Sequence, residues 1–239
     1  MIDLEDGSTI DPKDEIAYLG STLSEEGLIG RELGRRIGLA HSDFRGLIRL
    51  WRHTSLSKAR KLEVFNAVIT TKLLYSLASA WPNTSERRRI DGFQNRCLRT
   101  VCGIKPAYIS RVSNRHVLET TAQTPFSNVL MKQQLLLFGN AAREPEGRIL
   151  RDSTFVPGSF RPAADRYVRR VGRPRLEWAS QLYPHAIAVA GSSDRLAAAV
   201  RQPAEWRRNV AAYVGSLIRE RHSSVPPQVP LSVPTRRMA

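Results

Sequence analysis

Arginine is the side chain whose number and spacing suggest chemistry in this sequence. The segment from Arg31 to Lys61 holds nine basic residues and two acidic ones. A face that is merely solvated usually carries both signs, whereas guanidinium groups in a row suit the phosphates of a nucleic acid backbone. We therefore predict phosphate binding by the basic residues that face away from the apolar side of a helix: Arg31, Arg35, Arg45, Arg49 and Arg52. A solvated basic face is the alternative.

The charge of the whole chain points to the same kind of partner. Its 239 residues include 37 Lys and Arg against 22 Asp and Glu, a formal net charge of +15, although residues 1–27 hold eight of the acids and one base. Such a surplus indicates a polyanion, with nucleic acid the expected partner and an anionic membrane surface the rival. The chain has no apolar run of membrane-spanning length, and its acidic start resembles no secretory or transit signal. We therefore expect a soluble intracellular protein without a membrane partner.

The other reactive side chains form no recognisable site. Cys97 and Cys102 have no Cys or His pair downstream that could complete a zinc site, so we interpret them as buried small hydrophobic residues. The five histidines are scattered. We predict no catalytic residue, no metal ligand and no cofactor in this chain.

Hydrophobic periodicity predicts the elements that must position the arginines, and it indicates a mainly α fold. We expect helices over 28–53, from an N-cap at Ser57 to Pro82, from an N-cap at Thr84 or Ser85 to Gly103, over 113–121 and from an N-cap at Ser127 onward. Val129, Leu130, Gln133, Leu136 and Leu137 are predicted to face inward in the last of these. A short extended segment is predicted at 16–23, loops without periodicity at 143–174, and two more helices near 176–190 and 204–220. The proline-containing tail from Ser223 is predicted to be disordered.

Several short motifs resemble the region that follows the catalytic core of non-LTR (LINE-type) retrotransposon reverse transcriptases. Each is weak alone, but they occur in that family's order and extend from about Tyr18 to Val210. They are Tyr18-Leu19-Gly20, Glu32-x-x-Arg35-Arg36-Ile37-x-x-Ala40, Leu74-Tyr75, Asp91-x-Phe93-Gln94-Asn95-Arg96-Cys97-Leu98-Arg99 with Ile104, Val112-Ser113-Asn114, Gly172-Arg173-Pro174-Arg175-x-x-Trp178 and Ala204-Glu205-Trp206-Arg207.

The resemblance implies a domain organisation. Residues 1–27 would be the remnant of the palm and primer-grip hairpin, and 28–142 a helical thumb-like domain. A basic Pro/Gly linker at 143–174, a helical region at 175–222 and a disordered tail at 223–239 would follow. A thumb holds a template–primer duplex of RNA and DNA through its backbone, so the resemblance adds Tyr18, Gly20, Arg96 and Arg99 to the expected contacts. It also implies a polymerase palm upstream as a partner, and work on chromosomal DNA, hence the nucleus.

The same resemblance indicates that the chain is not an enzyme by itself. Polymerisation in this family uses carboxylates that bind two Mg²⁺ ions, and its Tyr-x-Asp-Asp signature lies upstream of Tyr-Leu-Gly. No Asp-Asp pair occurs in this sequence, and no Cys or His cluster after Cys102 could form the zinc knuckle of some members.

Two alternatives stay open. Gly172-Arg173-Pro174 matches the core of an AT-hook, which lies in the narrow minor groove of A·T-rich DNA. The chain could then be a standalone basic α-helical DNA-binding protein that uses Arg169, Arg170, Arg173 and Arg175. A basic turn before a helix explains the same tripeptide. The second alternative is a decayed reading frame without function.

Overall fold

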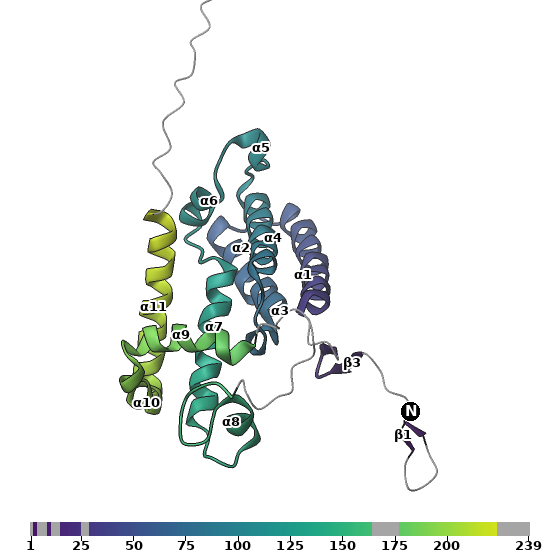
Figure 1. Ribbon diagram of the computed structural model, residues 1–239. Coiled ribbons are helices and arrows are strands. Elements are labelled where there is room, and N and C mark those ends of the chain that lie inside the picture. Colours follow the sequence, from purple (N-terminus) through teal and green to yellow (C-terminus); the bar gives the residue numbers. More distant parts are fainter. Residues whose placement is uncertain (1, 4–8, 11–14, 25–28, 164–176, 224–239) are drawn as a thin grey trace, which may run out of the picture.

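The computed structural model describes residues 2–3, 9–10, 15–24, 29–163 and 177–223 (Figure 1). The described chain is mainly helical, which confirms the predicted fold class. Two small hairpins precede the helices, and the long helix α7 runs between an amino-terminal group of helices, α1 to α6, and a carboxy-terminal group, α8 to α11.

The amino-terminal strands form two antiparallel pairs. β1 (Ile2–Asp3) pairs with β2 (Thr9–Ile10), and β3 (Glu15–Tyr18) pairs with β4 (Ser21–Ser24), where Tyr18 lies opposite Ser21. Leu19 and Gly20 make the two-residue turn between β3 and β4 with φ of 46° and 74°. Positive φ at both positions is the geometry that matches the twist of a hairpin. The extended segment predicted at 16–23 is therefore confirmed.

Helix α1 (Ile29–Arg52) is the longest element and has the predicted bounds to within a residue. Leu33, Ala40, Phe44 and Trp51 of its apolar stripe are buried. The stripe packs on α3 and α4, so the opposite face of α1 is left for its charged residues.

The single helix predicted from Ser57 to Pro82 is wrong beyond its beginning. Ser57 caps α2 (Lys58–Phe65) through its hydroxyl, as expected. The chain then forms a π-helical turn, η1 (Asn66–Thr70), a short α3 (Thr71–Leu74) and a 3₁₀ turn, η2 (Leu77–Ser79). The helix ends at Tyr75, which has a non-helical ψ of 130°, and the next residue, Ser76, is left-handed with φ 59°. Periodicity did not show this break, since the apolar spacing continues across it.

Helix α4 (Thr84–Cys102) has its N-cap one residue before Thr84 and two before Ser85, the two predicted caps. Asn83 is the N-cap and forms a reciprocal capping box with Glu86, and Gly103 ends the helix with φ 67°. α5 (Ala107–Ser110) follows. Ser113 caps α6 (Asn114–Thr120), which matches the short helix predicted over 113–121.

Helix α7 (Phe126–Arg143) is rotated from the predicted orientation. Its N-cap is Pro125, not Ser127, because the Ser127 amide and hydroxyl instead donate to the Asp91 carboxylate on α4 at 2.8 and 2.7 Å. Of the residues predicted to face inward, Leu130 is buried, Gln133 is exposed, and Val129, Leu136 and Leu137 are half-buried. The other buried residues of its middle are Met131, Gln134, Leu135 and Phe138.

The core consists of two hydrophobic clusters that meet within α7. Phe126 and Leu130 belong to the first, with α1 to α4 and α6, and Leu135 and Phe138 belong to the second, with α9 to α11. Trp206 of α11 donates to the Leu135 carbonyl at 3.0 Å and lies against Gly139, where even a methyl group would clash with the indole. α7 thus joins the two groups of helices.

The carboxy-terminal group holds more structure than its sequence indicated. Within the segment predicted as a loop linker lies α8 (Ile149–Thr154), with Phe155 buried after it, so that prediction is wrong for these residues. α9 (Trp178–Ala190) and α11 (Pro203–Ser223) match the two predicted helices, and α10 (Ser193–Arg201) was not predicted. Most of the tail from Ser223 lies outside the described residues. The domain boundaries stay a prediction.

Candidate nucleic-acid interface

The amino-terminal end of α1 binds the β3–β4 hairpin through its arginines. Arg31 forms an ion pair with Glu15 of β3. Arg35 and Arg36 both bind the carboxylate of Glu32 on their own helix, with donor–acceptor distances of 2.6 to 2.8 Å. Each of them also donates to the Gly20 carbonyl in the hairpin turn, at 2.6 and 2.5 Å. The guanidinium groups of Arg35 and Arg36 therefore attach the hairpin turn to the beginning of α1.

Glu32 is the centre of this arrangement. Its side chain is 8% exposed and that of Arg36 is 7% exposed. Burial by itself would raise the pKa of Glu32, but hydrogen bonds from Arg35, Arg36 and the Thr22 amide outweigh it and lower the pKa from 4.5 to about 2. The carboxylate is charged under all ordinary conditions and anchors both the helix and the hairpin.

Tyr75 completes the attachment, and sequence reasoning missed its role and that of Arg36. The Arg36 guanidinium lies 4.5 Å from the centre of the Tyr75 ring, and the Tyr75 hydroxyl donates to the Leu19 carbonyl at 2.8 Å. The four-residue step from Glu32 to Arg36 is a helix ion-pair spacing that could have indicated the pair. Nothing in the spacing of Tyr75 indicated its contact, which joins residues 56 positions apart.

The two hairpin residues predicted as contacts have different environments. Gly20 offers its carbonyl to Arg35 and Arg36, so this oxygen is used inside the protein. The Tyr18 side chain is 60% exposed on β3.

The arginines at the carboxy-terminal end of α1 differ from those at its beginning. Arg45, Arg49 and Arg52 are exposed. Within the described part of the chain, no ion pair or hydrogen bond involves their guanidinium groups. Steps of four and three residues place them on one face of the helix. The structure thus brings together three cations that face solvent.

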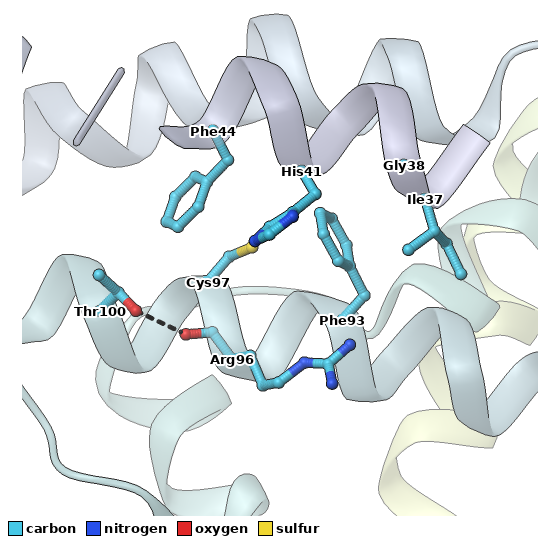
Figure 2. A pocket seen from close by; sticks show the side chains of 8 residues that line it. All are labelled: Ile37, Gly38, His41, Phe44, Phe93, Arg96, Cys97 and Thr100. Carbon is cyan, nitrogen blue, oxygen red and sulfur yellow. Dashed lines mark hydrogen bonds between the residues drawn. The ribbon is translucent and has the colours of Figure 1, made fainter. Parts of the chain in front are cut away.

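A groove between α1 and α4 adjoins this face. The two helices lie side by side in parallel, since Gly30 of α1 lies nearest Glu86 of α4 and Gly34 nearest Arg89. Further along, a cavity of about 340 Å³ opens between them. Figure 2 shows its lining, which comes from α1 (Ile37, Gly38, His41, Phe44) and from α4 (Phe93, Arg96, Cys97, Thr100). Arg96 is exposed on its wall, so this predicted contact joins the candidate interface.

Arg99 is a correction to the predicted contacts. It is 6% exposed, and its guanidinium donates to the Lys105 and Val112 carbonyls at 3.2 and 2.6 Å and to the Asn114 amide oxygen at 2.9 Å. These bonds fasten the loop that follows α4, and they leave the guanidinium away from solvent. We therefore remove Arg99 from the candidate interface.

The predicted contacts of the basic linker lie outside the described residues. They are Arg169, Arg170, Arg173 and Arg175, together with the AT-hook-like Gly172-Arg173-Pro174.

The described residues include no group of three or more His, Cys, Asp or Glu side chains placed to hold a metal ion. Burial raises the pKa of Cys97 to about 12 in spite of the nearby Arg96 charge, so its side chain is an uncharged thiol. Cys97 is buried, as expected, whereas Cys102 is half-buried. In the described part of the chain, every helix is too short or too polar to span a bilayer.

In comparisons with known proteins, no family model, no curated protein and no solved structure matches the chain.

Proposed function

We propose that this chain is a nucleic-acid-binding module that holds a duplex through its phosphates without reading sequence. Arg45, Arg49 and Arg52 of α1 and Arg96 of α4 supply the contacts. The observation that carries the proposal is the contrast along α1. The arginines at its beginning are bound to carboxylate or carbonyl oxygens, while those at its end are exposed and have no partner within the described residues. Unpaired guanidinium groups on one helix face suit phosphates spaced along a strand.

We further propose that the module corresponds to the thumb and downstream region of a non-LTR retrotransposon reverse transcriptase. The order of the motifs from Tyr18 to Val210 supports this, as does a hairpin followed by a helical bundle. On this proposal the bound duplex is an RNA–DNA template–primer, and Mg²⁺ belongs to the palm of the parent family. The chain by itself would not polymerise, because the sequence holds no Asp-Asp pair.

Binding of the purified chain to fluorescently labelled duplexes, followed by anisotropy over a series of salt concentrations, tests the proposal. We expect RNA–DNA hybrid and DNA duplexes of different sequence to bind alike, with affinity falling steeply as salt rises. No binding at 50 mM salt would contradict the proposal.

The same titrations test the first alternative, and thermal unfolding tests the second. A marked preference for A·T-rich DNA duplex over RNA–DNA hybrid would favour the standalone DNA-binding protein that uses Gly172-Arg173-Pro174. A chain that shows no cooperative thermal unfolding would favour the decayed reading frame.

A further inference from the structure

We propose that the groove between α1 and α4 holds one unpaired nucleotide of a bound nucleic acid, with the base in the cavity against His41 and its phosphate at Arg96. This inference rests on the proposed function and adds a ligand class to it. The candidate occupant is a base at a duplex end or in an overhang, not a base within the duplex.

The size and lining of the cavity carry the first step. Its volume of about 340 Å³ lies at the lower end of the range for small-molecule sites. A duplex could not enter, but a single ring system could. Phe44 and Phe93 form the buried floor of the cavity, and the exposed ring of its lining is the His41 imidazole (Figure 2). Aromatic rings are the surface on which unpaired bases stack without regard to sequence.

The charge of the lining carries the second step. His41 and Arg96 are its exposed polar members of basic type, and the lining includes no carboxylate. Within the described residues, no hydrogen bond or ion pair occupies the Arg96 guanidinium. A stacking surface beside a cation is the combination that single-stranded nucleic acid requires.

The position of the groove carries the third step. His41 is followed at helical spacing by Arg45, Arg49 and Arg52, so the cations proposed to bind phosphates continue along the same side of α1. If the sugar–phosphate backbone of a nucleic acid is bound along those arginines, its terminal nucleotide lies next to the cavity.

Gly38 keeps the cavity open. It lines the space, and a β-carbon at this position would meet no atom within 4 Å. A β-carbon can therefore be added without a clash, and we expect a leucine at this position to extend across the mouth of the cavity. Gly46 is also exposed and has the same free surroundings, but it does not line the cavity. Gly38→Leu and Gly46→Leu are thus a matched pair of variants on one helix.

The test compares two labelled DNA duplexes that carry three-nucleotide 3′ overhangs. One overhang consists of thymidines and the other of abasic residues, so both have the same number of phosphates but only the first has bases. For the unmodified chain and for Gly46→Leu, we expect the thymidine overhang to bind roughly fivefold more tightly or better. For Gly38→Leu we expect equal affinities, with the binding of a blunt duplex unchanged. Circular dichroism shows whether both variants fold.

Several results would overturn the inference. They are equal affinities for both overhangs in the unmodified chain, or a preference that Gly38→Leu keeps. If Gly38→Leu does not fold, photocrosslinking of a 5-iodouracil overhang to the unmodified chain decides, and crosslinks that avoid 37–44 and 93–100 would contradict it. The groove would instead belong to a protein partner if two results are found together. The unmodified chain would bind an acidic, phenylalanine-containing peptide that Gly38→Leu no longer binds, and it would show no preference for the thymidine overhang. If the unmodified chain does not bind a blunt duplex, the proposed function itself is wrong.

Discussion

The two ends of helix α1 use the same residue type for different purposes. At the beginning, Arg31, Arg35 and Arg36 are bound to Glu15, Glu32 and the hairpin turn. At the end, Arg45, Arg49 and Arg52 are exposed and, within the described residues, have no such partners. An arginine-rich helix face is therefore not a binding face over its whole length. The acidic residues available nearby decide which arginines stabilise the fold and which are offered to a ligand.

The largest effect is expected from removing the carboxylate at the beginning of α1. Glu32→Ala leaves the buried Arg36 without its ion-pair partner, and we expect the free energy of unfolding to fall by about 3–5 kcal/mol. Glu15→Ala is the matched control. Its ion pair with Arg31 is largely solvated, so the loss should stay below about 1 kcal/mol. Urea denaturation measures both, and equal losses would break the distinction between a buried anchor and a surface pair.

Acid should weaken the same anchor. Because the pKa of Glu32 is about 2 in the folded chain and 4.5 in the absence of its partners, its contribution is fully present above pH 4.5. It is lost as the pH falls toward 2, and the loss is worth roughly 3 kcal/mol. Denaturation between pH 5 and pH 2 follows this loss, and Glu32→Gln should flatten the dependence. A variant with the same slope as the unmodified chain would show that another group is responsible.

Removing the paired arginines should have a small effect on binding. In the chain with Arg31→Ala and Arg35→Ala, we expect the affinity for a DNA duplex to change by less than about threefold, since both cations already neutralise carboxylates of the protein. Anisotropy titration at fixed salt measures this. A drop of an order of magnitude would make the two ends of α1 equivalent and would break the comparison.

The smallest effect concerns the helix itself. Gly46→Ala at an exposed position with open surroundings should stabilise the chain by up to about 1 kcal/mol, because alanine has the higher helix propensity. Duplex affinity should stay the same. A thermal melt and one titration are sufficient, and lower stability would indicate that α1 needs a flexible point at Gly46.

Sequence periodicity predicted what depends on neighbours along the chain. The bounds of α1, its apolar stripe, the Ser57 cap, the short helix predicted over 113–121 and the β3–β4 segment are confirmed. Contacts between distant residues were not predictable in this way. The orientation of α7 follows from the bond of Ser127 to Asp91, and the burial of Arg99 follows from a loop that folds back on α4.

The same limit applied to the candidate site. Spacing identified the arginines of α1 as one basic face, and it was right about their exposure at the carboxy-terminal end. It could not show the partners that lie outside the helix, because Glu15 and Gly20 reach α1 only through the docked hairpin. The cavity between α1 and α4 likewise depends on how two helices pack, which periodicity does not determine.

The most direct test of the account is the salt dependence of duplex binding in two triple variants that lose the same charge. The first replaces Arg45, Arg49 and Arg52 with Ala, and the second replaces Arg195, Arg201 and Arg208, which are exposed on α10 and α11. We expect the first to reduce the slope of log K against log salt by about 2.7 and the affinity at 100 mM salt by roughly two orders of magnitude. We expect the second to change neither appreciably. Equal slopes in both variants would mean that net charge alone attracts nucleic acid, and the proposed interface on α1 would be wrong.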